Sequence, residues 1–223
     1  MKKIVLFFIL LLPLLAFSQE STTGTQQTTI RRISVGAEIF QDFWLNKPAG
    51  MDVRGINQGG GAFFLYSFPL GKSNFSFAIG AGVGFHNLYS NTMIDYIKAD
   101  TITFSPIPDT ISYKKSKLGL SYIDFPIEFR LKTNNKVRAS VGVKLGYLID
   151  AKTKYKGNNE FGDEIIIKTK GVSHVDKFRF GPTVRVGYDW FQVMGYFSVT
   201  KLFDKNKGPD LYPISVGITL MPF

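Results

Sequence analysis

The stretch KVRASVGVKLGYLID, residues 136–150, alternates apolar residues with small or charged ones. The odd positions are apolar, whereas the even positions hold Arg138, Lys144 and small residues until Leu148 breaks the pattern. Successive side chains of a β-strand point to opposite sides, so this period of two predicts a strand with two unlike faces. One face is apolar, and the other is narrow and polar.

The same alternation recurs between turn residues along the chain, while helical periodicity is weak. It predicts eight strands, at about residues 31–44, 58–68, 75–88, 118–131, 137–151, 177–189, 191–202 and 213–223. Short connections (69–74, 132–136 and Trp190) alternate with longer ones (45–57, 89–117, 152–176 and 203–212). We therefore expect an all-β fold, an eight-stranded antiparallel up-and-down transmembrane barrel with short periplasmic turns and longer outer loops.

The polar faces predict which side of the barrel meets lipid. They combine charge with most strand glycines, as expected for the interior of a barrel of about eight strands, where only side chains fit. The inward charges balance in sign: Arg32, Glu38, Asp42, Asp124, Glu128, Arg130, Arg138, Lys144, Asp150, Arg179, Arg185 and Asp189. Unpaired charges in a water-poor lumen are costly, so this balance favours a structural ion-pair network in a plugged barrel over an open pore.

Residues 1–18 are typical of a secretory signal peptide. Lys2 and Lys3 precede an apolar run from Ile4 to Leu15, and small residues at Ala16 and Ser18 predict cleavage after Ser18. The run is shorter than the roughly 20 residues of a spanning helix. We interpret residues 19–30 as a flexible periplasmic lead-in and residues 31–223 as the barrel, located in the cell outer membrane. The chain has no cysteine, which excludes disulfides and a lipid-anchored N-terminus.

The net charge of +10 makes the chain basic, but an exported protein does not meet nucleic acid as a routine partner. Outer-leaflet lipid, and lipopolysaccharide phosphate in particular, is the expected counterion, in a general electrostatic role. Lysines crowd the predicted outer regions: Lys98, Lys114, Lys115, Lys117, Lys152, Lys154, Lys156, Lys168, Lys170, Lys201, Lys205 and Lys207.

Aromatic residues gather where strands should cross the lipid interfaces. Phe43, Trp44, Tyr147, Phe178 and Tyr212 are expected in an outer girdle, and Phe75, Phe129, Tyr188, Trp190, Phe191 and Phe223 in an inner one. A terminal Phe223 resembles the C-terminal signal that the barrel assembly machinery recognises, which makes that machinery an expected partner.

The segment LGLSYIDFPIEFRLK, residues 118–132, resembles the "YLEIP" strand of the PorT-like outer-membrane β-barrel family of Bacteroidota. Tyr122, Asp124, Pro126 and Lys132 match that strand in kind. The resemblance implies a barrel of this family over the mature chain. Some members are implicated in type IX secretion and gliding, and most have no known role.

The longest loop contains a near-duplication, DTITF at 100–104 and DTISY at 109–113, around a Pro-rich tip. We expect these two pieces to pair as a hairpin, and residues 164–170 to extend the next pair of strands. One hypothesis is that loops 89–117 and 152–176 bind a protein partner by strand addition. The alternative is that these loops are solvated and merely shield the barrel.

Two rival functions predict different features. A lipid A-modifying enzyme would need a catalytic histidine; His86 has Ser90 nearby in sequence, and His174 lies beside Ser173 and Asp176, but neither sits in a nucleophile motif. We therefore expect no catalytic, cofactor or metal site. A soluble periplasmic barrel for a small apolar ligand would have an apolar interior and a polar exterior, the inverse of the pattern found.

Overall fold

The computed structural model describes residues 32–95, 100–159 and 161–221. The predicted signal peptide, the lead-in at 19–30 and the assembly signal at Phe223 lie outside these ranges. Within them, no helix is both long and apolar enough to cross a membrane.

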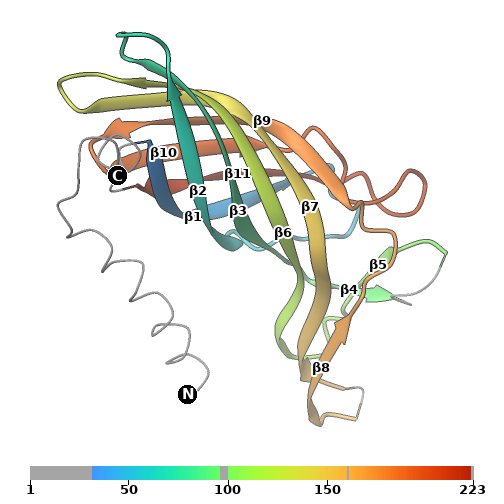
Figure 1. Ribbon diagram of the computed structural model, residues 1–223. Coiled ribbons are helices and arrows are strands. Elements are labelled where there is room, and N and C mark those ends of the chain that lie inside the picture. Colours follow the sequence, from blue (N-terminus) through green and yellow to red (C-terminus); the bar gives the residue numbers. More distant parts are fainter. Residues whose placement is uncertain (1–31, 96–99, 160, 222–223) are drawn as a thin grey trace, which may run out of the picture. The chain divides into compact units, whose positions relative to one another are not determined.

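Eight strands form a closed ring, as predicted (Figure 1). They are β1 (Ile33–Leu45), β2 (Gln58–Pro69), β3 (Phe75–Tyr89), β6 (Tyr113–Lys132), β7 (Val137–Asn158), β9 (Phe178–Tyr188), β10 (Phe191–Phe197) and β11 (Tyr212–Leu220). The ring runs β6-β3-β2-β1-β11-β10-β9-β7, and the pairing of β7 with β6 closes it. Every neighbouring pair is antiparallel, so the prediction of an eight-stranded antiparallel barrel is confirmed.

The turn predicted at Trp190 is also confirmed, although neither Gly nor Pro marks it. Asp189 and Trp190 alone connect β9 to β10. Asp189 has a φ of 53°, in the left-handed region that Asp tolerates better than most residues, and its N–H donates to the carbonyl of Lys136. This turn therefore lies beside the short β6–β7 turn, at the end of the barrel opposite the longer loops (Figure 1).

The two faces of the strands are oriented as the alternation predicts. Along β1, Ile39 is 64% exposed whereas Asp42 is fully buried, and the burial pattern alternates at every residue between Ile33 and Phe40. β9 alternates in the same way. A continuous apolar exterior of this size requires an apolar environment, which a lipid bilayer supplies.

Inward glycines allow the strands to approach closely in this small barrel. A Cβ at Gly142 would overlap the carbonyl oxygen of Ile127 on β6, and one at Gly181 would overlap that of Phe197 on β10. Even alanine at either position would therefore require the backbone of the neighbouring strand to move.

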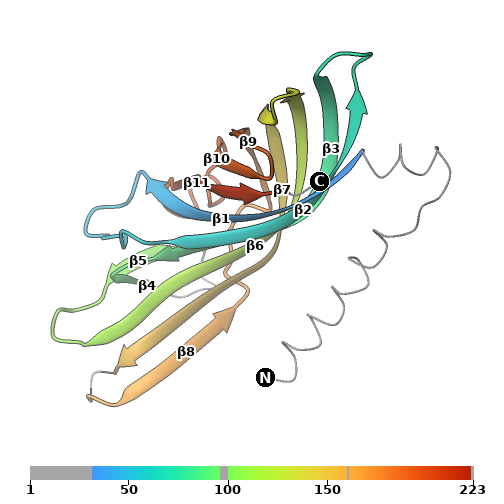
Figure 2. The same ribbon diagram turned by 90° about the vertical axis from the view of Figure 1, so that its left-hand side faces the viewer.

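β6 and β7 extend beyond the ring as a ladder, and a further strand, β8 (Glu164–Lys170), pairs with the end of β7 (Figure 2). We call the three-stranded extension formed by residues 113–121, 150–158 and 164–170 the outer sheet. The participation of residues 164–170 follows the prediction. Where the outer sheet meets the barrel, Ser121 pairs with Asp150 but Tyr122 pairs with Leu148, so β7 carries an extra residue, a β-bulge.

The predicted hairpin between residues 100–104 and 109–113 was wrong. β5 (Thr103–Pro106) instead pairs with β4 (Thr92–Asp95), and Tyr113 pairs with Gly157 of β7. The two near-identical segments therefore have different partners. The last residue of the second, Tyr113, belongs to β6, which pairs with β7, whereas Ile102 of the first is buried in an apolar cluster.

An apolar cluster fills the outer mouth of the barrel. It contains Trp44, Met51, Leu88, Ile102, Leu118, Leu120, Tyr122, Ala151, Val172, Val175, Leu202, Phe203 and Leu211. We call this cluster the cap. The placement of Trp44 in an outer aromatic girdle was wrong, because its side chain points into the cap, whereas the adjacent Phe43 is exposed as expected.

Candidate functional site

The lumen below the cap is lined by buried charges from four strands. Four are acids and four are bases: Glu38 and Asp42 on β1, Asp124 and Glu128 on β6, Arg138 and Lys144 on β7, and Arg179 and Arg185 on β9. All eight belong to the set predicted from the alternation. Six of them pair with one another, whereas Asp42 bonds to His86 and Arg138 pairs with Asp189. Each buried charge therefore has a partner in a space that excludes bulk water.

Arg185 is the centre of the first cluster. Its Nη2 donates to Glu38 Oε1 at 2.6 Å and its Nη1 donates to Glu128 Oε1, so it links β9 to β1 and β6 across the lumen. Lys144 Nζ adds a bond to Glu38 Oε2 at 3.3 Å, and the Thr219 hydroxyl donates to Glu38 Oε1. Arg185 Nε also donates to Glu38 Oε1, so Glu38 accepts from three residues, whereas Arg185 is the donor residue that the structure gives Glu128.

Arg179 is the centre of the second cluster. Its Nη2 donates to both carboxylate oxygens of Asp124, at 2.8 and 2.9 Å, and its guanidinium carbon lies 3.8 Å from the centre of the Tyr122 ring. This geometry combines a charge-assisted hydrogen bond with a cation–π contact. Tyr122 thus separates the charged lumen from the apolar cap, to which it also belongs.

His86 joins this cluster to Asp42. Arg179 Nη1 lies 2.7 Å from His86 Nε2, and because a guanidinium can only donate, Nε2 must accept. Nδ1 then carries the hydrogen and donates to Asp42 Oδ2 at 2.9 Å, while the Ser215 hydroxyl donates to Asp42 Oδ1. His86 is therefore a neutral lumen residue with a hydrogen bond at each ring nitrogen.

Of the remaining four predicted lumen residues, Arg130 bonds across the inside of the barrel to β1 and β2, and the other three lie toward the ends of the barrel. Asp150 and Asp189 are half-exposed near opposite ends of the strands; Asp150 pairs with Lys152, and Asp189 with Lys136 and Arg138. Arg130 is partly buried and donates to Ser67 and Ser34, and Arg32 is half-buried at the start of the chain described. Asp150 leaves the lumen because the bulge in β7 reverses the phase of its side chains.

The clusters leave little room in the lumen. The cavity bounded by Glu38, Asp124, Lys144 and Arg185 measures about 10 Å³. That volume is close to the minimum for one water molecule.

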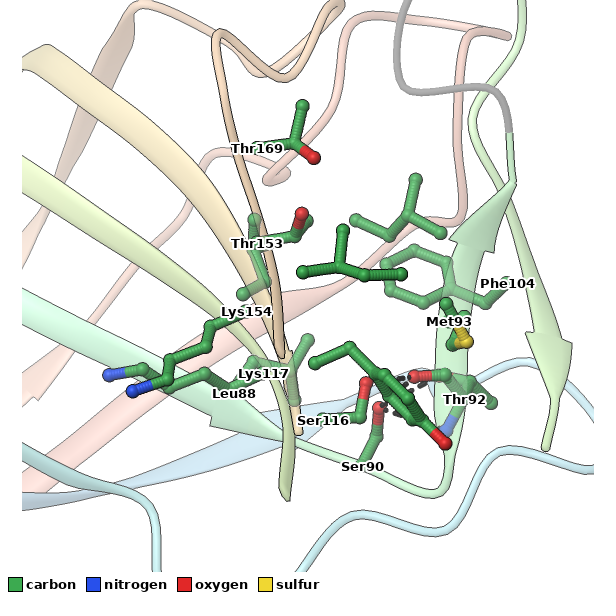
Figure 3. A pocket seen from close by; sticks show the side chains of 14 residues that line it. Leu88, Ser90, Thr92, Met93, Phe104, Ser116, Lys117, Thr153, Lys154 and Thr169 are labelled. Atoms are coloured by element: carbon green, nitrogen blue, oxygen red, sulfur yellow. Dashed lines mark hydrogen bonds between the residues drawn. The ribbon is translucent and has the colours of Figure 1, made fainter. Parts of the chain in front are cut away.

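A second cavity, of about 140 Å³, lies between the outer sheet and the β4–β5 hairpin (Figure 3). Leu88, Leu118 and Phe104 make it apolar. Thr153 and Thr169 form a cross-strand pair of β7 and β8 in the wall of the cavity. Lys117 and Lys154 border it but extend their ammonium groups away from it (Figure 3). The outer sheet thus presents an apolar face to this cavity and its lysines to the other side.

In the part of the chain that the structure describes, no hydrogen bond joins His86 or His174 to a serine hydroxyl. The Ser90 hydroxyl bonds to Thr92, not to His86, and His174 Nδ1 lies 3.8 Å from Asp204. Among residues 32–95, 100–159 and 161–221, no three His, Asp or Glu side chains form a group that could hold a metal ion.

Comparison with known families decides the class of this barrel. The family described as outer membrane protein beta-barrel domain matches residues 22–204. The chain belongs to this family. The outer-membrane barrel predicted from the alternation is thereby established.

Solved structures that resemble this outer-membrane barrel do so at low identity. Two are of Ail, the attachment invasion locus protein of Yersinia pestis, one of them in complex with the heparin analogue sucrose octasulfate. Each is 11% identical and covers 85% of this chain and 97% of Ail, with TM-scores of 0.40 and 0.41. A mutant Rh. blastica porin is 8% identical over 85% of this chain and 99% of its own, with a TM-score of 0.23. Likenesses of this degree carry no argument about function. No curated protein matches the chain.

We expect Arg185→Gln to lower the free energy of unfolding by roughly 3–5 kcal/mol, because it leaves Glu128 and part of Glu38 buried without their donor. The double variant Arg185→Gln/Glu128→Gln should recover part of this loss. Lys201→Gln, which breaks the exposed pair with Asp210, is the control and should cost at most about 1 kcal/mol. Urea unfolding of the refolded barrels in lipid vesicles gives the three values. Equal losses for Arg185→Gln and Lys201→Gln would contradict a structural role for the network.

Proposed function

We propose that this outer-membrane protein is a closed, non-conducting barrel that anchors the outer sheet at the cell surface. The observation that carries this proposal is the set of paired charges that cross the lumen, where the cavity bounded by Glu38, Asp124, Lys144 and Arg185 measures about 10 Å³. The cap adds a second barrier at the outer mouth, since buried apolar side chains exclude hydrated ions. The lumen charges act as structural links between strands.

Planar bilayer recordings test the closed barrel. The purified protein should give no steady current steps, because an ion would have to break the bonds of Arg185 or Arg179 to pass. A general porin inserted under the same conditions is the positive control. Stable ohmic steps in samples whose heat-modifiable migration shows a folded barrel would contradict the proposal.

A docking role is the more specific proposal, and the free edge of β8 favours it. In the part of the chain that the structure describes, β8 pairs with β7 on one side and with no strand on the other. Ile166 and Ile167, on opposite faces, are both exposed there. Open strand edges with apolar side chains are templates for another chain, so we propose that regions 89–117 and 152–176 receive a protein partner by strand addition at β8.

Photo-crosslinking in the native outer membrane tests the docking role. A photoreactive residue at Ile166 should give a discrete protein adduct, whereas one at Val141, on the lipid-facing surface of β7, should give none. The docking role is contradicted if the two positions give the same adducts, or if Ile166 gives none.

We also propose that the chain is a PorT-like member exported with a cleaved signal peptide and inserted by the barrel assembly machinery. Tyr122, Asp124 and Pro126, which carry the resemblance, are consecutive inward residues of β6, and Asp124 holds Arg179. A lipid A-modifying activity finds no support in the surroundings of His86 and His174.

A further inference from the structure

One face of the outer sheet carries seven lysines. Cross-strand pairs in a sheet share a face, and the register pairs Lys115 with Lys156, Lys117 with Lys154, Lys154 with Lys168, and Lys152 with Lys170. Residues two apart on one strand also share a face. We call Lys115, Lys117, Lys152, Lys154, Lys156, Lys168 and Lys170 the lysine face. The opposite face of the same sheet, with Thr153 and Thr169, lines the apolar cavity.

Carboxylates neutralise only part of the lysine face. Asp150 pairs with Lys152, and Glu164 pairs with Lys156 and with Lys114. Among the residues that the structure describes, no carboxylate lies within ion-pair distance of the other five lysines of the face. Burial, and after it the charges of four neighbouring lysines, lower the pKa of Lys154. Like charges directly opposite each other destabilise a sheet, so this face favours a bound anion.

The lysine face continues the lipid-facing surface of the barrel. On β6, the exposed Phe125 and Ile123 are followed outward, in the same phase, by Ser121 and Gly119, which are buried, and then by the half-buried Lys117. The apolar positions from Leu131 to Ile123 span roughly 26 Å along the strand, which at a tilt of about 40° is a height of about 20 Å, so the positions of Ser121 and Gly119 complete an apolar band of about 25 Å. The lysines therefore begin just beyond the hydrocarbon, at the level of lipid headgroups.

The bulge in β7 places the lysines of that strand on this surface. Tyr147 pairs with Ile123 and faces lipid, but Asp150 pairs with Ser121, so the outward phase changes from odd to even positions. Without the extra residue, Lys152 and Lys154 would point to the opposite face, toward the apolar cavity.

An aromatic ring completes the surface next to β6. Tyr89 of β3 pairs with Lys117, and its ring centre lies 5.4 Å from Lys117 Nζ, 5.5 Å from Lys115 Nζ and 5.9 Å from the Arg54 guanidinium carbon. Tyrosine beside lysine is typical of a membrane interface, where the ring meets the acyl boundary and the ammonium groups meet phosphate.

We infer that the lysine face binds the phosphate groups of the lipopolysaccharide molecules that adjoin β6, β7 and β8 in the outer leaflet. The continuity with the lipid-facing surface selects a membrane lipid over a soluble polyanion. This inference rests on the placement of the barrel in the outer membrane and not on the docking role of β8, so the two can fail separately.

The test compares two triple variants of the full chain in zwitterionic detergent micelles, titrated with fluorescent lipopolysaccharide and followed by anisotropy. K117Q/K154Q/K168Q removes the central row of the lysine face, and K201Q/K205Q/K207Q is the matched control with the same charge change elsewhere on the outer surface. The first variant should bind at least about tenfold more weakly, since each lysine near an anionic lipid surface contributes to the binding free energy. The control should bind with the affinity of the unaltered chain.

Enzymatically dephosphorylated lipopolysaccharide identifies the ligand group. The unaltered chain should bind it at least about tenfold more weakly than intact lipopolysaccharide. Because salt screens exposed charges, a higher salt concentration should reduce this difference in affinity between the two lipids. Equal binding of both lipids, or binding by K117Q/K154Q/K168Q equal to that of the control, would overturn the inference. So would a soluble sulfated polysaccharide that binds the face more tightly than lipopolysaccharide does. Heat-modifiable migration verifies that each variant is folded. If K117Q/K154Q/K168Q is not folded, the single variant K154Q replaces it in the same comparison.

Discussion

The width of an eight-stranded barrel is the constraint on which this structure depends. Such a ring encloses only enough space for side chains, so any charge turned inward must find its partner within the lumen. Arg185 between Glu38 and Glu128, and Arg179 between Asp124 and His86, satisfy that requirement by linking strands far apart in the sequence. The same side chains that satisfy the charges also fill the lumen.

Much of the barrel could be predicted from the sequence because the pleat of a strand imposes a period of two on each segment. The strands, the turn at Trp190 and the inward placement of residues such as Asp124 and Arg185 follow from that local rule. The cap could not be predicted in this way, because Trp44, Ile102 and Leu202 come from segments far apart in the sequence and only the closed barrel brings them together. The hairpin assigned to residues 100–113 failed for the same reason: local similarity between two segments does not determine which strand each one pairs with.

Leu148, the residue that interrupts the alternation in the stretch that determines the fold, marks the bulge in β7. On the barrel side of the bulge, even positions such as Lys144 point into the lumen and pair with acids. Beyond the bulge, even positions such as Lys154 instead lie on the lysine face. The extra residue therefore separates lysines that pair with acids inside the barrel from lysines on the lysine face. It also explains why the side chain of Asp150 lies outside the lumen.

The orientation of the strands is tested most directly by a cysteine scan along β7. The chain contains no cysteine, so single substitutions from Arg138 to Leu145 can each carry a fluorophore in vesicles made with brominated lipid. Quenching should alternate along the strand, strong at the odd positions such as Val141 and Val143 and weak at the even ones such as Arg138 and Ser140; Gly142 is left unsubstituted because no Cβ fits there. Quenching that is uniform, or that is stronger at the even positions, would contradict the arrangement of an apolar exterior in lipid around a charged lumen.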